Sequence, residues 1–180
     1  MGRGEVLATL IFVIIIATLL AVGVMLTQKP SSSTLTPSTT TKTSETSIGG
    51  ISMPKKIGIF LFKDDKFVDV STGKPWVPDE EGVVVAYFKQ IECGACIYFD
   101  PEFIKFCSWL KESGPKDVKV YIISASELKP NPDYIIESFL NHEIQATPTT
   151  VFFKDGKEVD RIVGAVSFDK LKETLLSILE

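Results

Sequence analysis

The apolar residues of the chain fall into two regions with different patterns. The first, residues 6–26, is an uninterrupted run without a charged side chain. At about 1.5 Å of rise per residue, a helix of about 20 apolar residues crosses a hydrocarbon core of about 30 Å. We therefore interpret residues 1–27 as an N-terminal transmembrane signal anchor. A cleaved signal peptide, whose apolar segment is shorter, and a buried core helix, which keeps a polar face, are the alternatives.

A polar segment follows at residues 28–51. Within residues 31–47, 13 of 17 residues are Ser or Thr. Such a segment buries too little apolar surface to offset the entropy lost when it becomes ordered. The composition therefore predicts a disordered Ser/Thr/Pro-rich linker or stalk, which leaves residues 52–180 as the folded domain.

The second apolar region, in residues 52–180, alternates between short runs and helical spacing. It predicts a hairpin (57–62 and 67–70), buried strands (83–88 and 118–123), helices (from 93, at 133–140 and at 168–179) and a closing hairpin (149–153 and 159–163). This order predicts an α/β fold whose mixed central sheet has a parallel centre and an antiparallel edge hairpin, and is flanked by helices.

The composition excludes one class of partner and gives a weak indication of the source. The net charge of −4 at pH 7 and the pI of about 5.2 argue against a nucleic-acid partner. Asn and Gln are scarce, five residues together, which is a weak sign of a thermophilic source.

Four motifs occur in the order in which the thioredoxin family carries them. They are Cys93-Gly94-Ala95-Cys96 between a buried strand and a helix, Pro101 in that helix, Ala146-Thr147-Pro148-Thr149-Thr150, and residues 152–157 followed by Gly164. On these motifs, residues 83–179 resemble the thioredoxin family. The resemblance implies a thioredoxin-like fold, a cis Pro148 beside the cysteines, and backbone groups near Thr147 and Pro148 that bind an extended substrate. An ordinary trans proline at the start of a strand is the alternative for Pro148.

Physical chemistry explains why the two cysteines belong at this place. The N-terminus of a helix presents unpaired N–H groups and partial positive charge, which favour a thiolate at Cys93. The two intervening residues, Gly94 and Ala95, bring Cys96 within disulfide reach. Cys93 is expected to attack a disulfide and Cys96 to resolve the mixed disulfide. No cofactor is implied besides the redox-active Cys93–Cys96 disulfide.

The chain also departs from the family. Glu92 replaces the tryptophan that normally precedes the first cysteine, and its carboxylate should disfavour a neighbouring thiolate. The family's buried acid should fall near Ala86 or Tyr87, and its lysine partner near Ile122, but all three are uncharged. We therefore expect Cys96 to be a buried thiol without a base, unless Glu92 or a water serves, and resolution to be slow near neutrality.

Taken together, the sequence predicts a thiol–disulfide oxidoreductase that acts on protein disulfides with a redox partner protein. We expect the anchor at 6–26 to hold the domain at the cell membrane, with the domain outside the cytoplasm. The direction stays open between oxidase or isomerase and reductase, including the cytochrome-biogenesis type. A redox-inactive binding module is an alternative, as is a metal-binding CxxC. Structural zinc takes four ligands, however, and neither Cys107 nor His142 is spaced to supply them. We expect Cys107 in the core and His142 in a surface loop.

Overall fold

The computed structural model describes residues 47–48, 50–79 and 81–180. The predicted anchor at 6–26 and most of the predicted linker lie outside these residues, so both stay predictions. Among the helices that the structure does describe, none is long and apolar enough to span a bilayer.

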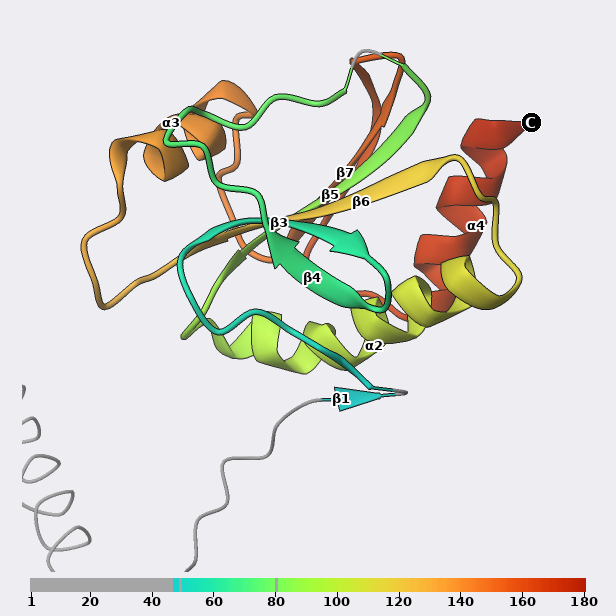
Figure 1. Ribbon diagram of the computed structural model, residues 1–180, viewed down its shortest axis with the longest axis horizontal. Helices are drawn as coiled ribbons and strands as arrows, with labels where there is room; N and C mark the ends of the chain where they lie inside the picture. Colours follow the sequence, from blue (N-terminus) through green and yellow to red (C-terminus); the bar gives the residue numbers. More distant parts are fainter. Residues whose placement is uncertain (1–46, 49, 80) are drawn as a thin grey trace, which may run out of the picture. The chain divides into compact units, whose positions relative to one another are not determined.

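A six-stranded mixed sheet forms the centre of the domain (Figure 1). Its order is β4-β3-β6-β5-β7-β8. The strands are β3 (Gly58–Lys63), β4 (Lys66–Asp69), β5 (Val83–Gln90), β6 (Val118–Ala125), β7 (Thr149–Lys154) and β8 (Lys157–Val163). Only β5 and β6 are parallel, and each edge is an antiparallel hairpin. The predicted parallel centre and closing hairpin are confirmed, and the predicted first hairpin forms the opposite edge.

Three helices cover the two faces of the sheet. They are α2 (Gly94–Glu112), α3 (Asp133–Asn141) and α4 (Phe168–Leu179). Side chains of α2 and α4 share one core cluster with one face of the sheet, and α3 packs on the other face. Figure 1 shows α3 on the side of the sheet opposite to α2. The domain is therefore a three-layer α/β structure, as the sequence predicts.

Strand β5 is buried on both faces because it is the central strand of these layers. Alternate side chains of a strand point to opposite faces. Val85 and Tyr87 lie in the cluster with α2 and α4, whereas Val84 and Phe88 lie in the cluster with α3. The uninterrupted apolar run is thus explained by two covered faces, and its end leads directly into the cysteine motif.

The folded part begins earlier than the predicted boundary at residue 52. Two short strands, β1 (Ser47–Ile48) and β2 (Ile51–Ser52), pair with each other through a turn in which Gly50 has a φ of +84°. Ile51 is 1% exposed and Met53 6% exposed, and both belong to the core cluster beneath α2. The folded part thus extends into the predicted linker of residues 28–51, because Ile51 is an apolar residue in a segment of mostly polar composition.

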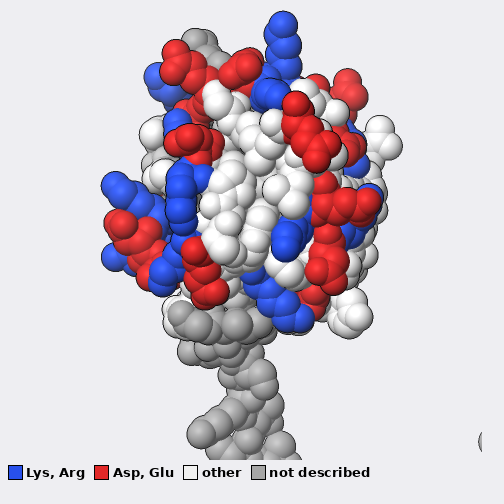
Figure 2. Space-filling view, turned by 90° about the vertical axis from the view of Figure 1, so that its right-hand side faces the viewer, with Lys and Arg blue, Asp and Glu red and all other residues white. Residues whose placement is uncertain are grey.

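The surface carries charges of both signs. On the face shown in Figure 2, Lys and Arg side chains are interspersed with Asp and Glu around an uncharged central band. A single-sign patch of the kind that binds a nucleic-acid backbone does not occur on that face.

Candidate active site

Cys93 is the N-cap residue of α2. Its backbone is extended, with φ −67° and ψ 117°, and its Sγ accepts a hydrogen bond of 3.3 Å from the Cys96 amide. The sulfur thereby takes the place of the oxygen of an ordinary capping side chain. The free N–H groups of the first helical turn point at the atom that must become a thiolate.

The two cysteines differ in exposure. Cys93 is partly exposed, whereas Cys96 lies one turn inside the helix and is fully buried. Gly94 and Ala95 between them are exposed, and a side chain added at Gly94 would meet nothing within 4 Å. A disulfide arriving from solvent therefore meets Cys93 first.

A loop from the other end of the domain closes the site. The Thr147–Pro148 peptide bond is cis, as the resemblance implied. The Cys93 thiol donates to the Thr147 carbonyl at 3.5 Å, and Thr147 Oγ1 donates to Gln90 Oε1 at 2.8 Å. The Gly164 amide donates to the Pro148 carbonyl at 2.7 Å. The ends of β5 and β8, the loop before β7 and the start of α2 thus meet at Cys93.

This environment separates the two thiols chemically. Burial by itself would raise the pKa of Cys93. Hydrogen bonds with the Cys96 and Thr147 side chains and with the Cys96 and Ala95 amides outweigh burial and hold this pKa below its ordinary value. Burial and the hydrogen bond to the Cys93 side chain raise the pKa of Cys96 to about 11. Cys93 is therefore the better thiolate, and Cys96 is the thiol that must lose a proton later.

Glu92 does not act as the sequence suggested. Its carboxylate accepts hydrogen bonds from Ser126 Oγ at 2.8 Å and from the Glu127 amide at 3.0 Å. The Glu127 amide is the main cause of its lowered pKa. Glu92 therefore ties the start of α2 to the loop after β6, and the pKa of Cys93 is lowered despite this neighbouring carboxylate.

Comparison with known sequences identifies the family. The sequence model of the thioredoxin-like domain matches residues 77–178. The chain belongs to the thioredoxin-like family. Thioredoxin Asp f 29 of Aspergillus fumigatus is 30% identical over 101 residues, which are 56% of this chain and 83% of that protein. A Thioredoxin H-type of Populus jackii is 32% identical over 98 residues, which are 54% of this chain and 61% of that protein. The chain is thus a member of a family of thiol–disulfide oxidoreductases.

Comparison with solved structures supports the same fold. The crystal structure of thioredoxin from Aeropyrum pernix superposes with a TM-score of 0.53 at 20% identity, and covers 68% of this chain and 95% of that chain. At this identity the likeness concerns the fold only. It agrees with the mixed sheet and the three helices described above.

The expectation that the site lacks a buried charge pair is wrong. Ala86, Tyr87 and Ile122 are buried and uncharged, as the sequence shows. A buried pair is instead formed by Lys89 and Asp100, whose Nζ and Oδ2 atoms lie 2.6 Å apart. Sequence reasoning missed it because it searched the strand positions at which thioredoxins carry the acid. The sequence spacing does indicate part of this arrangement. Lys89 follows Tyr87 on the same strand face, and Asp100 follows Cys96 by one helical turn.

The remaining cysteine, Cys107, and the single histidine, His142, lie outside the active site and pack against other side chains. Cys107 is fully buried in the core cluster, as predicted, and burial raises the pKa of its thiol. His142 lies in the turn that ends α3, as the predicted loop position requires, but it is half-buried there. Its ring packs against Trp76, and its Nε2 lies 3.3 Å from the Trp76 carbonyl. No three His, Cys, Asp or Glu residues within the described ranges are grouped so that they could hold a metal ion.

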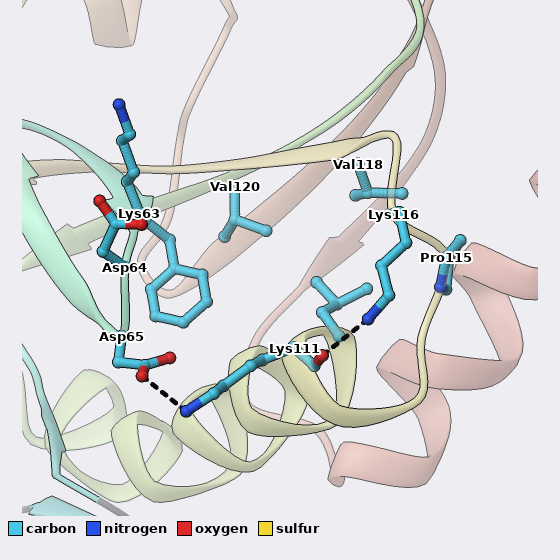
Figure 3. Close-up of a pocket in the computed structure, with 10 residues that line it drawn as sticks. Lys63, Asp64, Asp65, Lys111, Pro115, Lys116, Val118 and Val120 are labelled. Carbon is cyan, nitrogen blue, oxygen red and sulfur yellow. Dashed lines mark hydrogen bonds and ion pairs between the residues drawn. The ribbon is translucent and has the colours of Figure 1, made fainter.

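A separate cavity of about 550 Å³ lies at the C-terminal end of α2, beside Val118 and Val120 (Figure 3). At about 1.5 Å per residue, this end of the helix is roughly 25 Å from Cys93. Lys111 pairs there with Asp65 at 2.6 Å, and Lys116 donates to the Lys111 carbonyl at 2.7 Å. Lys111 and Lys116 thus already have partners, and we assign no chemistry to the cavity.

Proposed function

We propose that the protein is a thiol–disulfide oxidoreductase that acts on protein disulfides through Cys93 and Cys96. The observation that carries the proposal is the position of Cys93 Sγ, which accepts from the Cys96 amide and lies against the Thr147 carbonyl. In the reaction, the Cys93 thiolate attacks a substrate disulfide and forms a mixed disulfide. The Cys96 sulfur then displaces the substrate sulfur, which leaves the Cys93–Cys96 disulfide as the only redox group required.

The surface around Cys93 suits an extended polypeptide. Ile97 and Tyr98 are 52% and 78% exposed on the first turns of α2. With Pro101 and Val166 they line an open groove of about 660 Å³. Exposed apolar side chains beside a reactive thiol favour a protein substrate over a small disulfide. Thr147 and Pro148 offer backbone groups at the same edge, and a second, redox partner protein would meet the same surface.

We further propose that the domain works at the outer face of a membrane. The support is the uncharged run at residues 6–26 followed by the Ser/Thr-rich segment. An outward-facing domain on a stalk can reach disulfides of exported proteins, which form in oxidising compartments.

The direction of exchange depends on the reduction potential of the Cys93–Cys96 pair. A value near the thioredoxin figure of about −270 mV favours a reductase, which includes the cytochrome-biogenesis type, and one near about −120 mV favours an oxidant. Equilibration of the purified protein with glutathione or dithiothreitol buffers, followed by alkylation of free thiols, measures this potential.

Reduction of insulin by the full-length protein, with dithiothreitol as the electron donor, tests the activity itself. Cys93→Ser should abolish it, because no nucleophile remains. Cys96→Ser should accumulate a mixed disulfide through Cys93. Cys107→Ser is the matched control, since it removes a thiol outside the site and should leave the rate unchanged. A redox-inactive binding module would give no insulin reduction above the dithiothreitol background, and that result would refute the proposal.

A further inference from the structure

Three polar side chains meet in the core directly beneath the cysteines. Tyr87 and Lys89 lie two residues apart on β5, so both point to the α2 face of the sheet. Asp100 reaches them from α2. Lys89 Nζ lies 2.6 Å from Asp100 Oδ2, and Tyr87 Oη donates to Asp100 Oδ1 at 3.0 Å. Both oxygens of the buried carboxylate are therefore occupied, which offsets the cost of keeping its charge inside the protein.

This network reaches Cys96. Asp100 follows Cys96 by four residues, and the two share one face of α2. Tyr87 Oη lies 3.5 Å from the Cys96 carbonyl. Burial, the charge of Asp100 and the Cys96 side chain together raise the pKa of Tyr87 well above its ordinary value. Tyr87 thus stays protonated, and its hydroxyl interacts both with Cys96 and with the Asp100 carboxylate.

The carboxylate also has its own route to solvent. Asp100, which is 7% exposed, and Lys89 line a cavity of about 180 Å³ together with Met53 and Pro54. A cavity of this size that contains charged groups has room for water molecules. A proton on Asp100 can therefore leave without passing Cys93.

We propose that Tyr87 and Asp100 form a relay that removes the proton from Cys96 when the mixed disulfide is resolved. This inference rests on the proposed function. In this step Tyr87 accepts the proton of the Cys96 thiol and passes its own to Asp100. Asp100 and Lys89 act through Tyr87 and are positioning residues, with Lys89 holding the carboxylate in place at 2.6 Å.

The bonds that form and break in this step account for the electrons transferred. The Cys96 thiolate attacks Cys93 Sγ, the Cys93–Cys96 bond forms, and the bond from Cys93 to the substrate sulfur breaks. The electron pair leaves with the substrate sulfur, which takes up a proton from solvent. The protein dithiol is oxidised and the substrate disulfide is reduced to two thiols.

The pH dependence of this step depends on the groups that face Asp100. These are Tyr87 and Lys89 from β5, Cys96 from its own helix, and Lys55, which lines the cavity from the segment before β3. Without the relay, only the fraction of Cys96 that ionises by itself can attack. The rate of resolution should then rise about tenfold per pH unit below the Cys96 pKa of about 11.

Stopped-flow reaction of the reduced full-length protein with 5,5′-dithiobis(2-nitrobenzoate) separates the two steps. Attack by Cys93 releases the first thionitrobenzoate anion, and attack by Cys96 releases the second. In Asp100→Asn and Tyr87→Phe the second phase should slow at least about tenfold at pH 7 and acquire the steep pH dependence, while the first phase stays within about twofold. Glu112→Gln removes an exposed carboxylate of the same helix and should change neither phase.

Asp100→Glu tests for rescue, because it keeps a carboxylate on the same turn, and it should be faster than Asp100→Asn. If Asp100→Asn does not fold, the double variant Lys89→Met/Asp100→Leu removes both charges together and should also resolve slowly. Second-phase rates within about twofold of the unmodified protein in the folded relay variants, with an unchanged pH profile, would overturn the relay. Absence of any thionitrobenzoate release from Cys93 in the unmodified protein would instead overturn the proposed function, and the relay with it.

Discussion

The difference in pKa between Cys93 and Cys96 predicts which thiol reacts with an electrophile. At pH 7 a thiol with a pKa of about 11 is ionised in about one molecule in 10,000, whereas an ordinary cysteine with a pKa of about 8.5 is ionised in about one in 30. The pKa of Cys93 lies below its ordinary value, so a larger fraction of Cys93 is a thiolate. A thiolate loses nucleophilicity as its pKa falls, by a factor of about 8 over two pKa units. Cys93 should therefore be alkylated at least about tenfold faster than Cys96, and the full burial of Cys96 should widen this ratio.

Iodoacetamide labelling of the reduced protein measures these rates, with each cysteine-containing peptide quantified by mass spectrometry between pH 5 and pH 10. The Cys93 rate should reach its plateau at a lower pH than the rate of an unstructured cysteine peptide. Cys96→Ala removes a hydrogen bond that lowers the pKa of Cys93, so this plateau should move to higher pH. Cys107→Ala is the control and should leave the Cys93 profile unchanged. Faster labelling of Cys96 or Cys107 than of Cys93 would refute the assignment.

Three other features give measurable outcomes. Burial lowers the pKa of His142, so the unfolded chain binds a proton at this residue more readily than the folded protein does. The free energy of unfolding, measured with urea, should therefore fall as the pH drops from 6.5 through the pKa of His142 in the folded protein. The fall should be smaller in His142→Phe. Ser167 Oγ accepts from the Lys170 amide and caps α4, so Ser167→Ala should lower the free energy of unfolding by about 1 kcal/mol and Ser167→Asp should not. The full chain should stay with membranes after a carbonate wash and lose this behaviour when residues 1–27 are removed; recovery of the full chain in the soluble fraction would contradict the predicted anchor.

Periodic patterns in the sequence were sufficient for the architecture. The unbroken apolar run of β5 predicts a strand covered on both faces, and the spacing of Leu171 and Leu175 predicts an amphipathic helix with one buried stripe. Both patterns are local, since the period of a strand or helix fixes which side chains share a face. The cysteine motif and the Thr147-Pro148 loop were likewise visible, because each is a short segment with a distinctive composition.

Local sequence composition gave wrong predictions for residues whose environment depends on partners far away in the sequence. Ile51 lies at the end of a Ser/Thr-rich segment, and its burial against the core depends on the surface that α2 presents. Glu92 was expected to act on its sequence neighbour Cys93. Its actual partners, Ser126 and Glu127, lie more than thirty residues away, at the end of β6.

The buried network at the site required the tertiary structure for the same reason. The sequence by itself determined that Tyr87 and Lys89 share one face of β5, and that Cys96 and Asp100 share one face of α2. It did not determine that these two faces meet. That depends on how α2 packs across the sheet, and burial of a lysine and an aspartate is tolerable only if the packing brings each within hydrogen-bonding distance of the other. The 2.6 Å contact between Lys89 and Asp100 therefore depends on the packing of α2 against the sheet. The proton path that we propose for Cys96 depends on the same packing.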